Sequence, residues 1–306
     1  MGAEGGASRR PFRAHRLGTT WVAAAMIAPA ALVVFLVVAV PLARALWMSL
    51  FSIVLTRPGI EPFVGLGNYT RQLTNPDFWD AVARSFGFTL ASTAVELILG
   101  LGLALLMNQR LRFRWLLRGL AILPWALPGV SNALMWRWID HAQYGALNAL
   151  LTQTHLTADY VNFLGDPGLA MPMVVIADVY KNTPLVALLL LAALQTVPRE
   201  TVEAAQVDGA NTFRVFRHIT LPLIMPVILV ALVLRTIDAF KIFDTIWIMT
   251  RGGPANGTQT IGIYAYKTAY QSFDFGGGAA LGYLIAILIV GFAAVYIRLL
   301  RRSPVG

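Results

Sequence analysis

Residues 203–226 read EAAQVDGANTFRVFRHITLPLIMP and form a mixed, polar stretch between two strongly apolar segments. Pro198 precedes this stretch at a position where a helix can begin, because a proline in the first turn loses no helical hydrogen bond. The pair Asp208-Gly209 interrupts the helical pattern, since glycine adopts turn conformations that other residues resist. We therefore predict a short helix, a turn at Gly209 and a second short helix over 212–218, followed by the next apolar segment.

The composition of the whole chain indicates a membrane protein. Of its 306 residues, 57% are hydrophobic and 13% are charged, and the mean hydropathy is +0.66. A soluble domain has about a quarter charged residues. The chain has no cysteine, which excludes structural disulfides, thiolate metal sites and thiol catalysis. The net charge is +9, but the basic residues flank apolar segments, a pattern of membrane topology rather than of nucleic-acid binding.

Six apolar segments are long enough to cross a bilayer. The expected helices cover 21–43, 85–107, 119–138, 169–194, 222–248 and 276–299. Arg9 and Arg10 give the first segment a likeness to a twin-arginine export signal, but its apolar run is longer than such a signal needs. We therefore predict an all-α integral membrane protein with six transmembrane helices. A transmembrane domain over 21–300 is flanked by an N-terminal segment, 1–20, and a tail, 301–306.

The arginines predict which side of the membrane each loop occupies. They gather in 1–20, in the loop 108–118, in the central stretch of about 195–221 and near the tail, and they are sparse in the other loops. Because cytoplasmic loops carry an excess of basic residues, both termini and the central stretch are expected in the cytoplasm. The outer segment 139–168 has no lysine or arginine, and a short amphipathic helix is expected within it over 144–151.

Several short motifs resemble a known family of transporters. Glu203-Ala204-Ala205, then Gly209 and then ITLP at 219–222 resemble the EAA loop of permease subunits in binding-protein-dependent ABC importers. In that family the loop forms a cytoplasmic coupling helix that docks in a groove on the ATPase subunit. The outer stretches VGLGNY at 64–69 and NPDFW at 75–79 resemble those of sugar permeases. The resemblance extends over about 21–300 and is to the maltose, trehalose or glycerol-phosphate type.

This resemblance implies a function and a set of partners. The chain would form half of a translocation pathway beside a second, homologous permease in the cytoplasmic membrane of a prokaryote. Two ATPase subunits would bind ATP and Mg, and an extracytoplasmic binding protein would deliver a di- or oligosaccharide such as trehalose or maltose. The implied ATPase-coupling residues are Glu203, Ala204, Ala205, Asp208, Gly209, Phe213 and Phe216. The plainer alternative is an amphipathic loop that lies on the membrane surface.

The sequence offers no catalytic or cofactor motif of its own. Gly252 and Gly257 have the glycine spacing of a phosphate loop, but Thr258-Gln259 follows instead of a lysine and a hydroxyl residue. The four histidines show no metal-ligand spacing, and neither HExxH nor GxSxG occurs. We therefore expect a transport subunit without a catalytic residue, a cofactor, a metal site or a nucleic-acid partner.

Ionisable residues inside the expected helices mark a candidate substrate path, because each costs about 2.5–3.5 kcal/mol on insertion scales. Asp178, Lys181 and Asn182 share one face of the fourth expected helix, at i, i+3 and i+4. Four charges recur at every third residue of the fifth, where neighbours of opposite sign can pair: Arg235, Asp238, Lys241 and Asp244. Glu96, on the second expected helix, has no partner that the sequence identifies.

The family resemblance places a sugar site at these same two segments. In maltose-type permeases, however, neutral amides, aromatics or small residues are usual there, so the substrate stays open. The charges also allow two other interpretations. They can simply neutralise one another, or they can serve as the proton relay of a secondary transporter driven by an ion gradient. The EAA-like stretch argues against the second, because a secondary transporter has no ATPase to dock.

Overall fold

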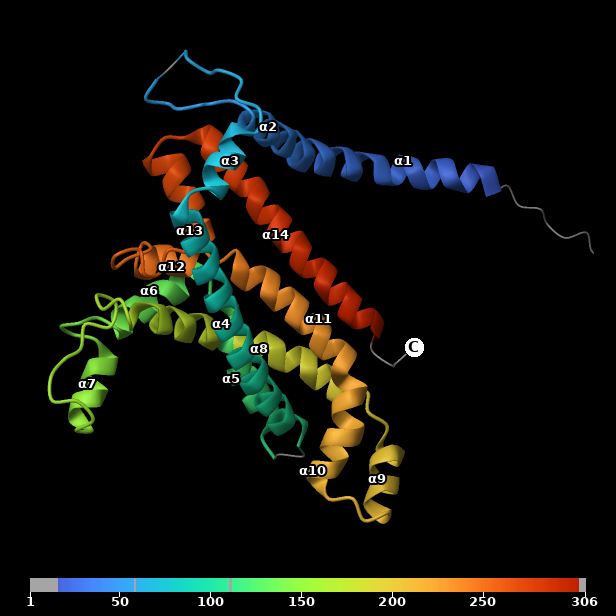
Figure 1. The fold of residues 1–306 in the computed structure, drawn as a ribbon. Coiled ribbons are helices and arrows are strands. Elements are labelled where there is room, and N and C mark those ends of the chain that lie inside the picture. Colours follow the sequence, from blue (N-terminus) through green and yellow to red (C-terminus); the bar gives the residue numbers. More distant parts are fainter. Residues whose placement is uncertain (1–15, 58, 110–111, 303–306) are drawn as a thin grey trace, which may run out of the picture.

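The computed structural model describes residues 16–57, 59–109 and 112–302 (Figure 1). All the secondary-structure elements of the described residues are helices, which confirms the all-α membrane fold. Five segments of the described residues, some of them built from several consecutive helices, are long and apolar enough to cross a membrane: Trp21–Ser49, Pro76–Asn108, Ala170–Gln195, Thr212–Met249 and Phe275–Tyr296. The remaining predicted span, over 119–138, corresponds to a shorter apolar helix, Trp115–Ala126, so the count of six stays a prediction. Most of the predicted N-terminal segment and tail lies outside the described residues.

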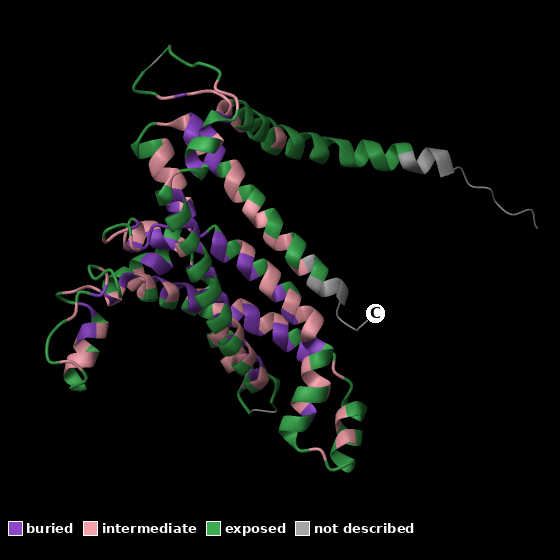
Figure 2. Cartoon of the chain, in the orientation of Figure 1, coloured by how far each residue is buried: buried purple, intermediate pink, exposed green. Residues whose placement is uncertain are grey.

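The first helix stands apart from the rest of the molecule. It consists of α1 (Arg16–Val34), a π-helical segment (Phe35–Ala39) and α2 (Val40–Ser49). It projects away from the other helices, and nearly all of its described residues are exposed (Figures 1 and 2). Only α2 packs closely, against α14 (Phe275–Arg302), where the Tyr283 hydroxyl donates to the Leu42 carbonyl at 2.6 Å. The predicted end at residue 43 was wrong, because Arg44 can extend its charge toward water without ending a helix.

Two helices begin where the sequence predicted a loop between residues 43 and 85. α3 (Gly67–Leu73) is followed directly by α4 (Pro76–Asn108), which starts nine residues before the predicted residue 85. Pro76 occupies the first turn of α4, and the Asn75 side chain caps the helix by accepting the Asp77 backbone N–H at 3.0 Å. The prediction followed hydropathy, which marks where the lipid begins and not where the helix begins.

The third predicted span is two helices, α5 (Arg114–Ala126) and α6 (Gly129–Ile139). The break lies at Leu127, whose backbone is extended because the following proline disfavours the helical conformation. Asn132 on α6 donates a hydrogen bond to the Ala177 carbonyl at 3.1 Å and so attaches α6 to its neighbour. The predicted continuous helix over 119–138 was therefore wrong.

The short helix predicted over 144–151 is confirmed as α7 (Ala146–Gln153). The buried Asn148 side chain holds it to the following loop, since its amide donates to the Val161 carbonyl and accepts the Val161 N–H, both at 2.9 Å.

Three long helices build the core: α4, α8 (Ala170–Gln195) and α11 (Leu221–Phe240). Buried residues follow the length of all three (Figure 2). α4 and α8 approach closely at Gly100, where a Cβ atom would lie only 2.8 Å from Val186 Cγ1. Small residues allow such close contact, which is a main source of attraction between helices in a bilayer.

The fifth predicted span ends earlier than expected. α11 stops at Phe240, and α12 (Asp244–Met249) starts after a short break without proline or glycine. The predicted single helix over 222–248 was therefore wrong. α12 packs against α6, where Arg137 donates to the Ile248 carbonyl at 3.2 Å, so tertiary contacts set this break. α13 (Ile261–Tyr266) and a π-helical segment (Lys267–Gln271) then lead to α14.

Candidate functional site

The polar stretch between α8 and α11 forms a hairpin at the lower end of Figure 1. α9 (Arg199–Val207) starts directly after Pro198, as predicted. Gly209 has a φ of +82°, in the left-handed region that favours glycine. No atom lies within 4 Å of a Cβ built on Gly209, so the backbone alone imposes the requirement. The predicted turn is confirmed.

The second arm of the hairpin differs from the prediction. α10 (Thr212–Val215) is capped by Asn211, whose side chain accepts the Arg214 N–H at 2.9 Å. It continues through a π-helical segment (Phe216–Thr220) into α11 without interruption. The predicted separate helix over 212–218 was therefore wrong. Pro222 does not break the run, because local π-helical geometry re-satisfies backbone groups near a proline.

The hairpin exposes an apolar tip. Phe213 is 66% exposed, and Val207, on the other side of the turn, is 88% exposed. Ala204 and Asp208 are also exposed, whereas Ala205 and Phe216 are partly buried. Val207 was not among the predicted coupling residues, although its apolar side chain next to the glycine turn was a usable signal. We define Val207, Asp208, Gly209 and Phe213 as the hairpin tip.

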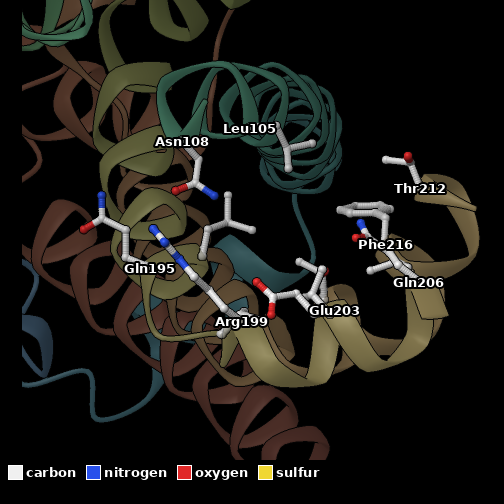
Figure 3. Close-up of a pocket in the computed structure, with 13 residues that line it drawn as sticks. Leu105, Asn108, Gln195, Arg199, Glu203, Gln206, Thr212 and Phe216 are labelled. Atoms are coloured by element: carbon white, nitrogen blue, oxygen red, sulfur yellow. The ribbon is translucent and has the colours of Figure 1, made fainter. Parts of the chain in front are cut away.

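A groove separates the hairpin from the ends of α4 and α8. It encloses about 840 Å³, and its walls combine apolar and polar side chains. Figure 3 shows Asn108 and Gln195 on one side and Phe216 on the other. Glu203 and Arg199 extend from α9 into the same space. The predicted residues Glu203 and Phe216 therefore line the inner face of the hairpin, while Phe213 faces outward.

A second polar site lies inside the helix core. Arg235 on α11 binds Glu96 on α4 through two hydrogen bonds, Nε to Oε2 at 2.6 Å and Nη2 to Oε1 at 2.8 Å. Its Nη2 also donates to Asp178 Oδ2 on α8 at 3.2 Å. All three side chains are less than a tenth exposed. Such two-point contacts between guanidinium and carboxylate are strong and geometrically specific.

Two neutral side chains complete this site. The Ser92 hydroxyl lies 3.0 Å from Glu96 Oε1 and 2.5 Å from Asp178 Oδ2. Asn182 donates to Asp178 Oδ1 at 2.8 Å. Every carboxylate oxygen of the site therefore has a partner. We define Ser92, Glu96, Asp178, Asn182 and Arg235 as the buried charge cluster. Sequence reasoning found no partner for Glu96, because Arg235 lies on another helix. It also missed Ser92, although Ser92 lies four residues before Glu96 on α4.

The model of the family described as binding-protein-dependent transport system inner membrane component matches residues 96–303.

The chain belongs to this family.

The permease is 40% identical to the trehalose/maltose transport system permease protein of Thermococcus litoralis, over 96% of this chain and 97% of that one. It is 37% identical to the sulfoquinovosyl glycerol transport system permease protein of Agrobacterium fabrum, over 94% and 92%. Among solved structures, a bacterial ABC transporter that imports the acidic polysaccharide alginate has the same fold. Its TM-score is 0.80 at 22% identity, and the match covers 94% of this chain and 98% of that one. The permease is thus a multi-pass membrane subunit of ABC importers.

The other charged residues of the predicted substrate path are more exposed to solvent than the buried charge cluster. Asp238 and Lys241 form an ion pair at 3.0 Å, with side chains 51% and 57% exposed. Lys241 directly follows the end of α11, and Asp244 starts α12. The predicted series of four charges on one helix was therefore wrong, and Arg235 pairs across helices instead. Lys181 Nζ and Asp244 Oδ2 each lie 3.4 Å from the position of a Cβ on Gly129, so α6, α8 and α12 bring them together.

Aromatic rings continue from these charges along α12 and α13. Phe243 contacts Trp247 and Tyr266, with ring centroids 5.8 and 5.1 Å away, and Tyr266 contacts Tyr270 at 5.0 Å. Phe243, Trp247 and Tyr266 are partly exposed. Phe240, by contrast, is fully buried against Phe86 and Phe292. The half-exposed charges therefore lie beside a partly accessible aromatic series.

Two residues of the permease, Asp140 and Lys267, have shifted pKa values. Asp140 follows α6 and is buried, and neither of its carboxylate oxygens accepts a hydrogen bond from the described residues. Burial raises the pKa of Asp140 from 3.8 to about 6. Burial also lowers the pKa of Lys267, whose Nζ donates to Gln259 Oε1 at 2.7 Å.

Proposed function

We propose that this permease forms half of the pathway of an ATP-driven importer for a sugar, a di- or oligosaccharide such as trehalose or maltose. The observation that carries the proposal is the 40% identity, over nearly the whole chain, to a permease named for trehalose and maltose. The name of the second relative, which refers to a sulfoquinovosyl glycerol, also supports a sugar-containing substrate.

The proposal includes the assembly and the topology. A second, homologous permease would complete the pathway, and two ATPase subunits would hold ATP and Mg, since no phosphate-loop motif occurs in this chain. A periplasmic binding protein would deliver the sugar, as in the alginate importer solved with such a protein. A six-helix domain over 21–300, with the loop 195–221 and both termini in the cytoplasm of the inner membrane, fits the distribution of arginines.

We assign the coupling to the ATPase to the hairpin. Val207 and Phe213 expose apolar surface at a turn that extends beyond the helix core (Figure 1). An exposed apolar pair with charged neighbours, here Asp208 and Arg214, is typical of a surface that is covered in a complex. Glu203, Ala204, Ala205 and Phe216 would then support the tip from α9 and from the inner face of the second arm.

We assign sugar contacts to the more open members of the predicted path. Lys181, Asn182, Asp238, Lys241 and Asp244 are all at least partly exposed. The aromatic faces of Phe243 and Trp247 beside them offer stacking surfaces, and sugar sites combine such surfaces with a few polar groups. Asp178 and Arg235 complete the predicted path, but their polar atoms are engaged inside the buried charge cluster. We place them behind the path, where they position Asn182 and α11.

The test is uptake of labelled trehalose and maltose by vesicles that contain the permease with its partner permease, ATPase and binding protein. We expect uptake that requires ATP on the ATPase side and continues when a protonophore dissipates the proton gradient. Uptake that stops with the protonophore while ATP is constant would support the secondary transporter instead. Uptake of neither sugar, with ATP hydrolysis intact, would overturn the choice of these two sugars.

A further inference from the structure

The buried charge cluster connects segments that are distant in the chain. The Arg235 bonds to Glu96 span 139 residues, and the bond to Asp178 spans 57. Each charged member belongs to a different helix of the core, α4, α8 or α11. One guanidinium thus holds three helices at one level.

Two of these helices are the ones that enter and leave the hairpin. At 1.5 Å per residue, Asp178 lies about 26 Å from the end of α8, and Arg235 lies about 21 Å from the start of α11. The cluster therefore closes a loop of chain at a level well inside the membrane, opposite the hairpin. A displacement of the hairpin that α8 and α11 transmit must either move the cluster or break it.

Apolar packing fills the space between the cluster and the hairpin. Ala104 on α4, Leu190 on α8 and Ile224 on α11 belong to one buried cluster of side chains. Gly100, one helical turn from Glu96, lets α4 and α8 approach closely at Val186. The three helices are thus in contact from the cluster to their cytoplasmic ends.

The half-exposed ion pair of Asp238 and Lys241 lies on the other side of the buried charge cluster from the hairpin. Asp238 follows Arg235 by three residues on α11, and Lys241 marks the end of that helix. Along α11, Arg235 therefore lies between the hairpin and Asp238 and Lys241, two of the residues that we assign to the sugar.

We propose that the buried charge cluster is the positioning element that makes α4, α8 and α11 one rigid body, so that a displacement of the hairpin reaches the sugar-contacting residues. Arg235 acts through Asp178 and Glu96 and does not touch the sugar. The inference rests on the proposed function. The alternative is that the cluster only neutralises its own charges, in which case a neutral replacement of the same shape serves equally well.

The test measures distances inside the assembled complex. Because the chain has no cysteine, Asp80→Cys on α4 and Arg217→Cys beside the hairpin give two unique spin-label sites when the partner subunits are cysteine-free. Both residues are exposed. The distance is recorded without nucleotide and after trapping with ATP and vanadate, neither of which requires the sugar to be known.

In the complex with the native cluster, we expect one narrow distance distribution that is the same in both states. In the variant Glu96→Gln/Asp178→Asn/Arg235→Met, the distribution should shift or broaden on trapping. The matched control, Arg71→Gln/Asp274→Asn, removes an ion pair between α3 and the start of α14, and its distance should stay constant. A constant distance in the triple variant, or an equal shift with the native cluster, would overturn the proposal.

A second readout separates positioning from simple stability. With trehalose as the probe, the ATP hydrolysed per sugar imported should rise about tenfold in the triple variant, within the usual range of coupling between two sites. An unchanged ratio would contradict the proposal. If the triple variant does not assemble, Glu96→Gln alone decides, because it keeps the size of the side chain and replaces one of the two oxygens that accept from Arg235 with an amide donor. Its distribution should broaden on trapping, and a narrow, unchanged one would contradict the proposal.

The two proposals can fail separately. Absence of ATP-dependent trehalose uptake by the native complex would remove the proposed sugar, while the distance comparison would still decide whether the cluster holds the three helices together.

Discussion

The hairpin tip and the buried charge cluster use polar residues in opposite ways. At the tip, Asp208 and Phe213 are exposed and face away from the rest of the chain. In the cluster, every carboxylate oxygen and the guanidinium are bonded within the chain and hidden from solvent. Under the proposed function another molecule covers the tip, whereas the cluster is complete in itself. Substitutions at the tip should therefore alter assembly, and substitutions in the cluster should alter stability or motion.

The sharpest test of this difference is Arg235→Met. The substitution leaves Glu96 and Asp178 buried without their cation, and breaking a buried pair in this way costs about 3–5 kcal/mol. We expect the thermal unfolding temperature of the purified complex to fall strongly, with a low yield. Arg71→Gln, which breaks an ion pair with a half-exposed arginine, should cost at most about 1 kcal/mol. Equal effects of the two substitutions would erase the distinction.

For the half-exposed ion pair of Asp238 and Lys241 we expect the reverse, a loss of uptake with little loss of stability. Asp238→Asn/Lys241→Met removes an exposed ion pair, so the unfolding temperature should change little. If these residues bond to the sugar, the loss of one charged hydrogen bond of about 1.5–3 kcal/mol lowers uptake by roughly ten- to a hundredfold. Initial uptake rates, compared at equal amounts of assembled complex, measure this. Normal uptake would remove the pair from the proposed path.

Combining the two regions gives a related check. In Arg235→Gln/Asp238→Asn, one member comes from the buried charge cluster and the other from the half-exposed pair. Since each removes a different contact, we expect lower stability from the first and lower uptake from the second. Normal uptake by an assembled double variant would mean that both residues only balance charge.

Asp140 extends the comparison to a buried carboxyl group without a partner. Its folded pKa of about 6 lies above the ordinary 3.8, so folding favours the protonated form. Its contribution to stability is therefore fully present below pH 4 and is lost as the pH rises through 6. Asp140→Asn should remove this dependence and stabilise the permease by about 2 kcal/mol at neutral pH. Unfolding temperatures from pH 4 to 8 measure it, and parallel curves for the two proteins would contradict the assignment.

The smallest expected effect is at Gly209, where only the backbone matters. A side chain in the left-handed conformation costs about 1–2 kcal/mol, and there is room for one. Gly209→Val should therefore release the ATPase or weaken its binding, while the membrane helices stay folded. Gly209→Asn is the matched control, because asparagine tolerates this conformation. Co-purification of the ATPase reports the result. Normal retention with valine would separate the tip from ATPase docking.

The sequence predicted local features well and long-range ones poorly. The hairpin turn followed from Pro198 and Gly209, whose effects are confined to their own backbone. Helix limits failed at Arg44 and Pro76, because apolar runs mark the lipid and not the helix. The break after Phe240 carries no proline or glycine, and it depends on packing between α12 and α6. Arg235, the cationic partner of Glu96, is 139 residues away, beyond the reach of any periodicity.

The two arms of the hairpin differ in stiffness. The second arm is helical without interruption from Thr212 into α11, whereas the first joins α8 through the non-helical residues Thr196, Val197 and Pro198. A continuous helix resists twisting about its axis, and an extended link does not. A partner that turns the hairpin would therefore deliver torque to α11, while α8 would experience only tension. Inserting one glycine into the link 196–198 should then leave transport intact. Two glycines within the π-helical segment Phe216–Thr220 should instead uncouple transport from ATP hydrolysis.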